Sequence, residues 1–299
     1  MELPAHQEKG GFDHAAVHNK SGILYIAHTA NDSLDLIDTR TDKYLHSIPN
    51  LTGVAGVFVS NEKDLVFTSN RGEKTVGVFQ HGQEGKLEKV RVGGDPNGLA
   101  FDPSLNNLLA ANVSRPDDPI PITASIVDVK KNILTADILM PGRTRWAVFD
   151  KKSARFYINI AKPSQIVAVV SLDPDGIVDT YDIPATGPHG LDIDLEGRRL
   201  FCACDQRVLL TVDLHTRQTS HPFDLSGPPD VIFYNSHRKH LYVASGYPGT
   251  IDLFDTATMK RVQTVKTEEG AHTIGYNSES GKVYAFLHET HRASVYVDE

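Results

Sequence analysis

The sequence has few of the residues that mark disulfide-rich or redox proteins. Among 299 residues there are two cysteines, Cys202 and Cys204, and a single tryptophan. The two cysteines are separated by one residue on an expected strand, so their side chains point to the same face. Neighbours on one face of one strand are poorly placed to form a disulfide with each other. The sequence therefore excludes a disulfide framework and favours a reducing compartment.

Long hydrophobic runs are also absent. No stretch approaches the roughly 20 apolar residues that a membrane-spanning helix needs, so we expect no membrane span. No positively charged and then apolar leader precedes the first repeat described below. We therefore expect a cytoplasmic protein, and a periplasmic or secreted location stays open if a leader has been removed.

A strongly basic surface is missing as well. The formal net charge is −8, and the basic pairs at 151–152 and 238–239 are small and isolated. Because nucleic-acid grooves need a concentrated positive surface, we expect no nucleic-acid partner. The sequence also lacks a G-x-S-x-G elbow, a phosphate-binding glycine loop and an H-E-x-x-H helix.

What the sequence does contain is one short pattern that returns seven times. Its second positions are His14, Ala55, Asn97, Trp146, His189, Asp230 and His272. The steps between them are 41, 42, 49, 43, 41 and 42 residues, and the 27 residues after position 272 plus the first 14 make 41 more. A period of this length, with several short strands per unit, is typical of propeller blades. We predict an all-β, seven-bladed β-propeller in a single domain over residues 1–299, with blades starting near 13, 54, 96, 145, 188, 229 and 271.

Each repeat predicts four antiparallel strands, except the last. In the first repeat the inner strand begins at 15–17, and β-branched or aromatic runs follow at 23–27, 33–37 and 44–48. The last repeat ends after a third strand at 293–297. The N-terminal Glu2-Leu3-Pro4 is similar to the outer-strand tail at 181–184, so we predict that it completes the last blade. Such pairing removes an exposed sheet edge.

The segments Leu24–His28 with Leu34–Asp38, and Leu241–Ser245 with Ile251–Asp255, carry a resemblance to a known family. Together with Val66–Asn70, they resemble the YVTN-type seven-bladed β-propellers, which are related to lactonase-like propellers. The resemblance covers the whole chain and implies the fold. Lactonase-like relatives imply hydrolysis of lactones or similar esters, although such propellers host unrelated activities. We find no match in this chain to the glutamate, asparagine and aspartate metal set of gluconolactonases.

The ring of second positions is unusually rich in histidine. In a propeller the inner strand starts at the mouth of the central channel, so these seven side chains converge there. His189, Asp230, His272 and His14 belong to the fifth, sixth, seventh and first blades, which adjoin once the ring closes. His28, at the end of the second strand of the first blade, is expected in the same quadrant.

Three imidazoles and a carboxylate at a solvent-filled mouth predict a divalent-metal site. Neutral imidazole and carboxylate suit zinc, manganese, iron or nickel, and an open position would activate water. The expected ligands are His14, His189, His272 and Asp230. Two alternatives stay open: the histidines simply bond to water and backbone, or a histidine pair performs acid–base work without metal.

Other residues are candidates for substrate contact. Trp146 offers a stacking wall or a plug for the channel, and Arg145, preceded by Arg143, offers an anion site. Amide side chains at the mouth are expected to hydrogen-bond a substrate; these are Asn70, Asn97 and Asn112. The insertion at 114–121 lies on the mouth face as a functional or decorative loop, and Cys204 is a ligand, a nucleophile or a core residue.

Together these features predict a monomeric enzyme that acts on a small molecule at the channel mouth. The expected chemistry is metal-assisted hydrolysis of a lactone or ester-like substrate, or a related lyase or isomerase step, with His28 and Asp230 as catalytic groups. The alternative is a non-enzymatic propeller that binds a ligand or a protein.

Overall fold

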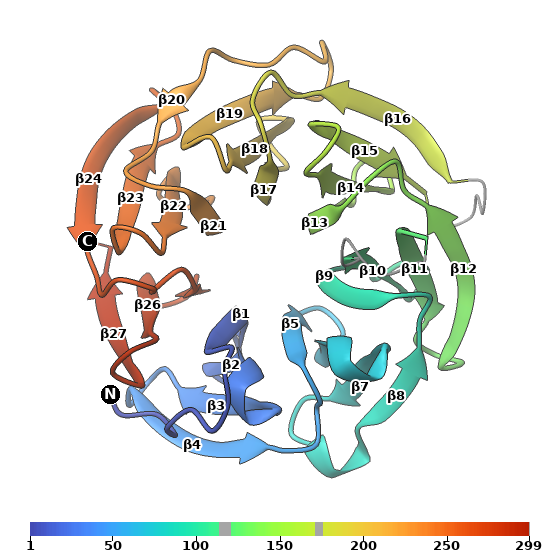
Figure 1. Cartoon of the computed structure of the whole chain (residues 1–299), viewed down its shortest axis with the longest axis vertical. Helices are drawn as coiled ribbons and strands as arrows, with labels where there is room; N and C mark the ends of the chain where they lie inside the picture. Colours follow the sequence, from blue (N-terminus) through green and yellow to red (C-terminus); the bar gives the residue numbers. More distant parts are fainter. Residues whose placement is uncertain (114–120, 171–175, 299) are drawn as a thin grey trace.

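The computed structural model describes residues 1–113, 121–170 and 176–298 of the chain. Its strands form seven separate antiparallel sheets, arranged as blades around a central axis (Figure 1). The predicted seven-bladed β-propeller is therefore confirmed. The described residues contain no α-helix, only the single 3₁₀ turns η1 (Thr29–Asn31), η2 (Arg71–Glu73) and η3 (Glu84–Lys86). None of their helical segments has the length and apolar character to cross a membrane.

The strands occupy four concentric positions. The inner strands are β1 (Phe12–His18), β5 (Val54–Ser60), β9 (Asp95–Asp102), β13 (Thr144–Asp150), β17 (Pro188–Asp194), β21 (Pro229–Asn235) and β25 (Ile274–Asn277). The second strands are β2 (Ile23–His28), β6 (Leu65–Asn70), β10 (Asn107–Val113), β14 (Arg155–Ile160), β18 (Arg199–Cys204), β22 (His240–Ser245) and β26 (Lys282–Leu287). The third strands are β3 (Ser33–Asp38), β7 (Thr75–Gln80), β11 (Thr123–Asp128), β15 (Gln165–Val169), β19 (Val208–Asp213), β23 (Thr250–Asp255) and β27 (Arg292–Val297). The outer strands are β4 (Lys43–Ile48), β8 (Glu88–Arg91), β12 (Ile133–Leu139), β16 (Ile177–Asp182), β20 (Phe223–Asp224) and β24 (Lys260–Lys266).

The observed blade starts agree with the predicted ones to within one residue in six blades. In the seventh blade β25 begins at Ile274, three residues after the predicted start at 271. The intervening backbone is held by other contacts: the amide of Ala271 bonds to Glu268 and that of His272 to Gly270. His272 therefore stands on a turn at the mouth and not within a strand.

The core lies between neighbouring blades. Second and third strands are almost fully buried, whereas outer strands such as β24 are exposed over most of their length. One apolar cluster joins Leu109 and Ile126 of the third blade to Phe156 and Ile158 of the fourth. Because each blade covers its neighbour, the ring buries both faces of every sheet, and the mouth residues sit on a rigid support.

The N-terminal segment closes the ring, as predicted. Glu2 forms an antiparallel bridge to Arg292 on the free edge of β27. The amide of Leu3 donates to the carbonyl of His291 at 2.9 Å, and Met1 and Ala293 exchange two backbone bonds. The pairing is a short bridge and not a full fourth strand, so the last blade has three strands and a tied edge.

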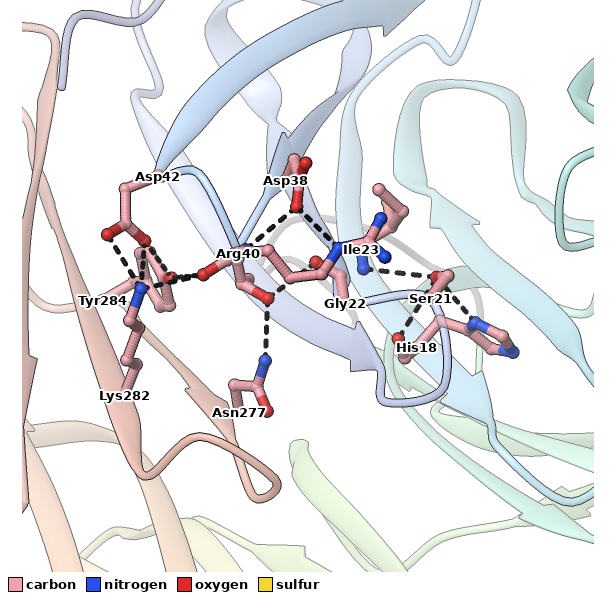
Figure 2. Close-up of polar contacts among 11 residues, drawn as sticks. His18, Ser21, Gly22, Ile23, Asp38, Arg40, Asp42, Asn277, Lys282 and Tyr284 are labelled. Carbon is pink, nitrogen blue, oxygen red and sulfur yellow. Dashed lines mark hydrogen bonds and ion pairs between the residues drawn. The ribbon is translucent and has the colours of Figure 1, made fainter.

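A second seal joins the first and last blades on the face opposite the mouth (Figure 2). The carboxylate of Asp42 accepts from Lys282 Nζ at 2.8 Å and from Tyr284 Oη at 2.6 Å. Asn277 Nδ2 donates to Thr39 Oγ1 at 2.7 Å. The N-terminus therefore lies beside a blade boundary that is tied on each face of the ring, whereas Asp298 near the C-terminus bonds to His240 and Tyr242 of the sixth blade.

Candidate functional site at the channel mouth

The mouth is formed by the starts of the inner strands and by the turns between second and third strands. Four of the predicted residues do meet there. Asp230 is at the centre: its Oδ1 lies 3.2 Å from His189 Nε2, and its Oδ2 lies 3.9 Å from His272 Nε2. His14 also interacts electrostatically with Asp230 and contributes to lowering its pKa. The spacing of the repeats thus led to histidines that are far apart in the sequence but lie around one carboxylate.

His189 is held between two carboxylates. Its Nδ1 donates to Asp205 Oδ1 at 2.7 Å, and its Nε2 faces Asp230. Burial opposes the charged form, but Asp230 and Asp205 outweigh it and raise the pKa of His189 to about 9. Burial would raise the pKa of Asp230, yet His189 above all lowers it strongly. At neutral pH the pair is an imidazolium and a carboxylate.

His272 is positioned differently. Its Nδ1 bonds to the carbonyl oxygen of Gly270 at 2.7 Å, so in the neutral ring the proton resides on Nδ1. Nε2 then carries the lone pair. It stands beyond hydrogen-bond distance of Asp230, and one third of the side chain is exposed. His272 therefore presents a basic nitrogen to the mouth.

His14 faces Asp13, with its Nε2 3.5 Å from Asp13 Oδ1. Its ring stacks on Trp146 from the opposite side of the axis, with centroids 4.0 Å apart and planes 16° apart. Burial lowers the pKa of His14, against the fields of Asp13 and Asp230. The stacked pair lies at the mouth end of the axis, and both roles considered for Trp146, a plug and a stacking wall, stay predictions.

Three arginines surround the mouth. Arg71 pairs with Asp13 at 3.3 Å and donates to Asn97, and Arg145 lies 3.9 Å from Asp205. Arg143 is exposed and makes no ion pair within the described residues. Partial desolvation at the mouth, and then the positive charges of Arg145 and Arg71, lower the pKa of Arg143. Like charges held this close favour an anionic ligand.

The metal site stays a prediction, and the structure gives its proposed ligands other partners. Both nitrogens of His189 already face carboxylates, and a metal ligand must offer a free lone pair. His14 Nε2 lies 3.5 Å from Asp13 Oδ1, and the face of its ring lies against Trp146. Over residues 1–113, 121–170 and 176–298, no group of three or more histidine, cysteine, aspartate and glutamate side chains is arranged to hold a metal ion.

The structure places several other predicted residues away from Asp230. His28 is buried, with Nδ1 2.7 Å from Asp35 Oδ2 and Nε2 2.7 Å from His6 Nδ1. Asn70 and Asn112 are buried and donate to hydroxyls of their own blades. Cys204 is buried in an apolar cluster, and Cys202 and Cys204 are free thiols. Of the insertion at 114–121, residues 114–120 lie outside the described part of the chain.

Three site residues were missed from the sequence: Asp13, Arg71 and Asp205. Arg71 and Asp205 directly follow the second strands β6 and β18, on turns that face the mouth. The same rule that selected Asn70 and Cys204 would have found them one residue further along. Asp13 immediately precedes the first ring position, so the side chains flanking the ring positions also belonged in the search.

Comparison with known proteins adds the fold alone. No family model matches the chain, and no curated protein matches it. Among solved structures 1752 chains are similar, which shows how widely the architecture is shared. One is a structure described as Kuenenia stuttgartiensis hydrazine synthase, with a TM-score of 0.84 and 12% identity, covering 100% of this chain and 97% of that one. At this identity the likeness carries no chemistry.

Proposed function

We propose that the channel mouth binds a small organic anion and hydrolyses a lactone or ester bond in it. The observation that carries the proposal is the partly exposed Nε2 of His272 beside the Asp230–His189 ion pair, at a mouth that also carries three arginines of the second and fourth blades. The reaction class comes from the resemblance to lactonase-like propellers. The acid–base route corresponds to the metal-free alternative considered for the sequence.

In this scheme His272 is the general base. Its Nε2 takes a proton from a water molecule while the water oxygen attacks the substrate carbonyl. The carboxylate of Asp230 stabilises the imidazolium that forms, because opposite charges attract strongly at a partly buried site. The imidazolium then returns the proton to the departing alkoxide as the ester C–O bond breaks. An acid and an alcohol are the products.

The other groups position the substrate and the base. His189 is an imidazolium that fixes Asp230 and balances its charge, so it acts through Asp230 and not on the substrate. Arg143 is free to bind a carboxylate of the substrate, and Arg145 extends that positive surface. Arg71 holds Asn97 in place, which leaves the amide group of Asn97 beside the same mouth.

The proposal is tested with lactones and esters in matched pairs, one member with a free carboxylate group and one without. Hydrolysis is measured as proton release at constant pH. We expect turnover of the anionic members only, and a loss of roughly 10²- to 10⁴-fold in His272→Gln, the usual contribution of a general base. The exposed His221 lies in the loop after β19 and supplies the matched control, His221→Gln. Arg143→Gln is expected to raise KM for anionic substrates with less effect on kcat.

Two other outcomes are informative. Binding of the anions without turnover would favour the non-enzymatic ligand-binding propeller, since the same arginines serve either role. Elemental analysis addresses the metal expectation: stoichiometric metal that disappears in His189→Gln and His272→Gln would restore it. Absence of both binding and turnover across the panel would refute the proposal.

A further inference from the structure

A cavity of about 620 Å³ runs along the axis beneath the mouth. It is lined by inner-strand residues of all seven blades, and the stacked rings of His14 and Trp146 stand at its mouth end. Its other end is bordered by residues of the turns that follow the inner strands, including Asn19, Asn61 and Lys151. We call this cavity the axial channel. It is separate from the arginine-rich mouth.

The wall of the axial channel is aromatic and apolar. Phe58, Trp146, Val148, Phe233 and Tyr276 line it, and each is only half-buried. Large apolar side chains that stay partly exposed inside a concave cavity favour an apolar ligand over water. The volume is that of typical small-molecule sites.

Two acidic side chains line the cavity: Asp192 lies within this wall, and the exposed Glu62 follows an inner strand beside Asn61. Asp192 lines the channel and accepts the backbone amides of Tyr234 and Ile193, each at 2.7 Å. Among the described residues Asp192 has no cationic partner. Burial raises its pKa to about 6, which is still below neutral pH. At neutral pH a carboxylate therefore faces an aromatic cavity without a counter-charge, which is costly unless a ligand supplies one.

We propose that the axial channel binds an organic cation with an apolar body, such as a protonated arylalkylamine. The ammonium group would pair with Asp192. The aromatic rings would pack against the apolar body and make cation–π contacts with the ammonium group. Anions are disfavoured because Asp192 repels them. The proposal is independent of the chemistry at the mouth, because no residue of the hydrolytic scheme lines the cavity.

Trp146, the single tryptophan, makes binding visible by fluorescence. The probes are 4-phenylbutylamine, 4-phenylbutanol and 4-phenylbutyrate, which share one body and differ in charge. We expect the amine to change the fluorescence with saturation and to bind about tenfold tighter than the alcohol, the effect of one charge-assisted bond. The acid is expected to bind weakest. Calorimetry on the same samples gives the stoichiometry, expected to be one.

Three variants make the result specific. Asp192→Asn should bring amine and alcohol to equal affinity, and Val148→Phe, which fills the cavity, should abolish binding of both. Val178→Phe is the matched control, because Val178 is 40% exposed on the outer strand β16. Thermal melting confirms that each variant folds. His272→Gln should leave amine binding unchanged, so failure at the mouth and failure in the channel are distinguishable.

The proposal is overturned if the amine does not bind, or binds no tighter than the alcohol. It is also overturned if Val148→Phe folds and still binds the amine with unchanged affinity. In that case the site lies elsewhere on the surface.

Discussion

At the residue scale, the mouth depends on charges that support one another. His189 is the clearest example, because its imidazolium is stabilised by Asp205 of its own blade and by Asp230 of the next blade. A protonation state of this kind is part of the folding free energy, so it can be measured without knowing any substrate.

The first prediction concerns stability at alkaline pH. The folded-state pKa of His189 is about 9, above its ordinary 6.5, so the folded state binds the proton more tightly than the unfolded chain does. The resulting stabilisation is complete below pH 6.5 and is lost as the pH rises through about 9. We expect urea unfolding to show a decline of about 2 to 3 kcal/mol over this range. In His189→Gln the decline should be largely absent, and an unchanged decline would contradict the assignment.

The thiols give a second prediction at the same scale. Cys202 and Cys204 are buried with their sulfurs 3.8 Å apart, and the contact with Cys204 together with burial raises the pKa of Cys202 well above its usual range. Thiolate is the reactive form, so neither should react with a thiol reagent in the folded protein at neutral pH. Both should react after unfolding in urea. A thiol that reacts at once in the native state would revive the active role considered for Cys204.

At the element scale, the inner strands approach one another closely at the axis. The residue after the ring position is glycine in three blades, and a Cβ there would meet the next inner strand. A Cβ on Gly56 would lie 2.1 Å from the carbonyl oxygen of Asn97. On Gly98 it would lie 2.5 Å from that of Arg145, and on Gly190 2.6 Å from that of Asp230. The repeated glycine thus sets the spacing on which the mouth geometry depends.

Gly190→Ala tests this spacing. Its Cβ would collide with the backbone of Asp230 and with Ile232, so β21 must move. We expect a loss of about 1 to 3 kcal/mol in stability, the usual cost of overpacking, and a shift in the Asp230 contacts with His189 and His272. Gly85→Ala is the control, because its Cβ would meet nothing within 4 Å. Equal melting temperatures for the two variants would contradict the close approach.

The register of seven inner strands was predictable because burial on both faces forces a regular apolar pattern on every blade. The meeting of His189, Asp230 and His272 followed from that register alone. The spacing also located the turns that carry Asp205 and Arg71, but not the directions of their side chains, which depend on local backbone geometry.

Two residues, His14 and His28, differ from their predicted roles. For His14 the reason is the length of the side chains at the axis, and for His28 it is a segment that covers it. The register puts His14 and Trp146 on opposite sides of the axis, but their side chains are long enough to stack across it. His28 ends its strand on the mouth face as expected. The N-terminal segment then brings His6 onto it, so its nitrogens bond to His6 and Asp35 and not to solvent.

At the scale of the whole molecule, ring closure joins two ends that are far apart in sequence. The N-terminal segment contacts both the last and the first blade. His6 is at the centre of these contacts, with its ring 4.9 Å from His28, 4.9 Å from His288 and 4.3 Å from His291. Because four imidazole rings take part in the contacts that close the ring, protonation makes this closure sensitive to acid.

The direction of this sensitivity follows from the hydrogen bonds. His28 Nδ1 donates to Asp35, so His28 Nε2 accepts from His6 Nδ1, and the unprotonated His6 Nε2 is left buried without a hydrogen-bond partner. Protonation of His6 would add a proton to that nitrogen. Burial, and then the neighbouring His28, His291 and His288, lower the pKa of His6 to about 4.

We therefore predict that acid loosens the closure before the rest of the ring. Because the folded-state pKa of His6 lies below its ordinary 6.5, stability is complete above pH 6.5 and falls as the pH is lowered toward about 4. Hydrogen exchange should show the amides of Leu3 and Ala293 losing protection first, while those of β14 and β18 stay protected. In His6→Gln this loss should be smaller. Asp192, whose pKa is raised to about 6, acts in the opposite sense in both proteins, so the difference between them isolates His6. Uniform exchange across all blades on acidification would show instead that the ring opens as one unit.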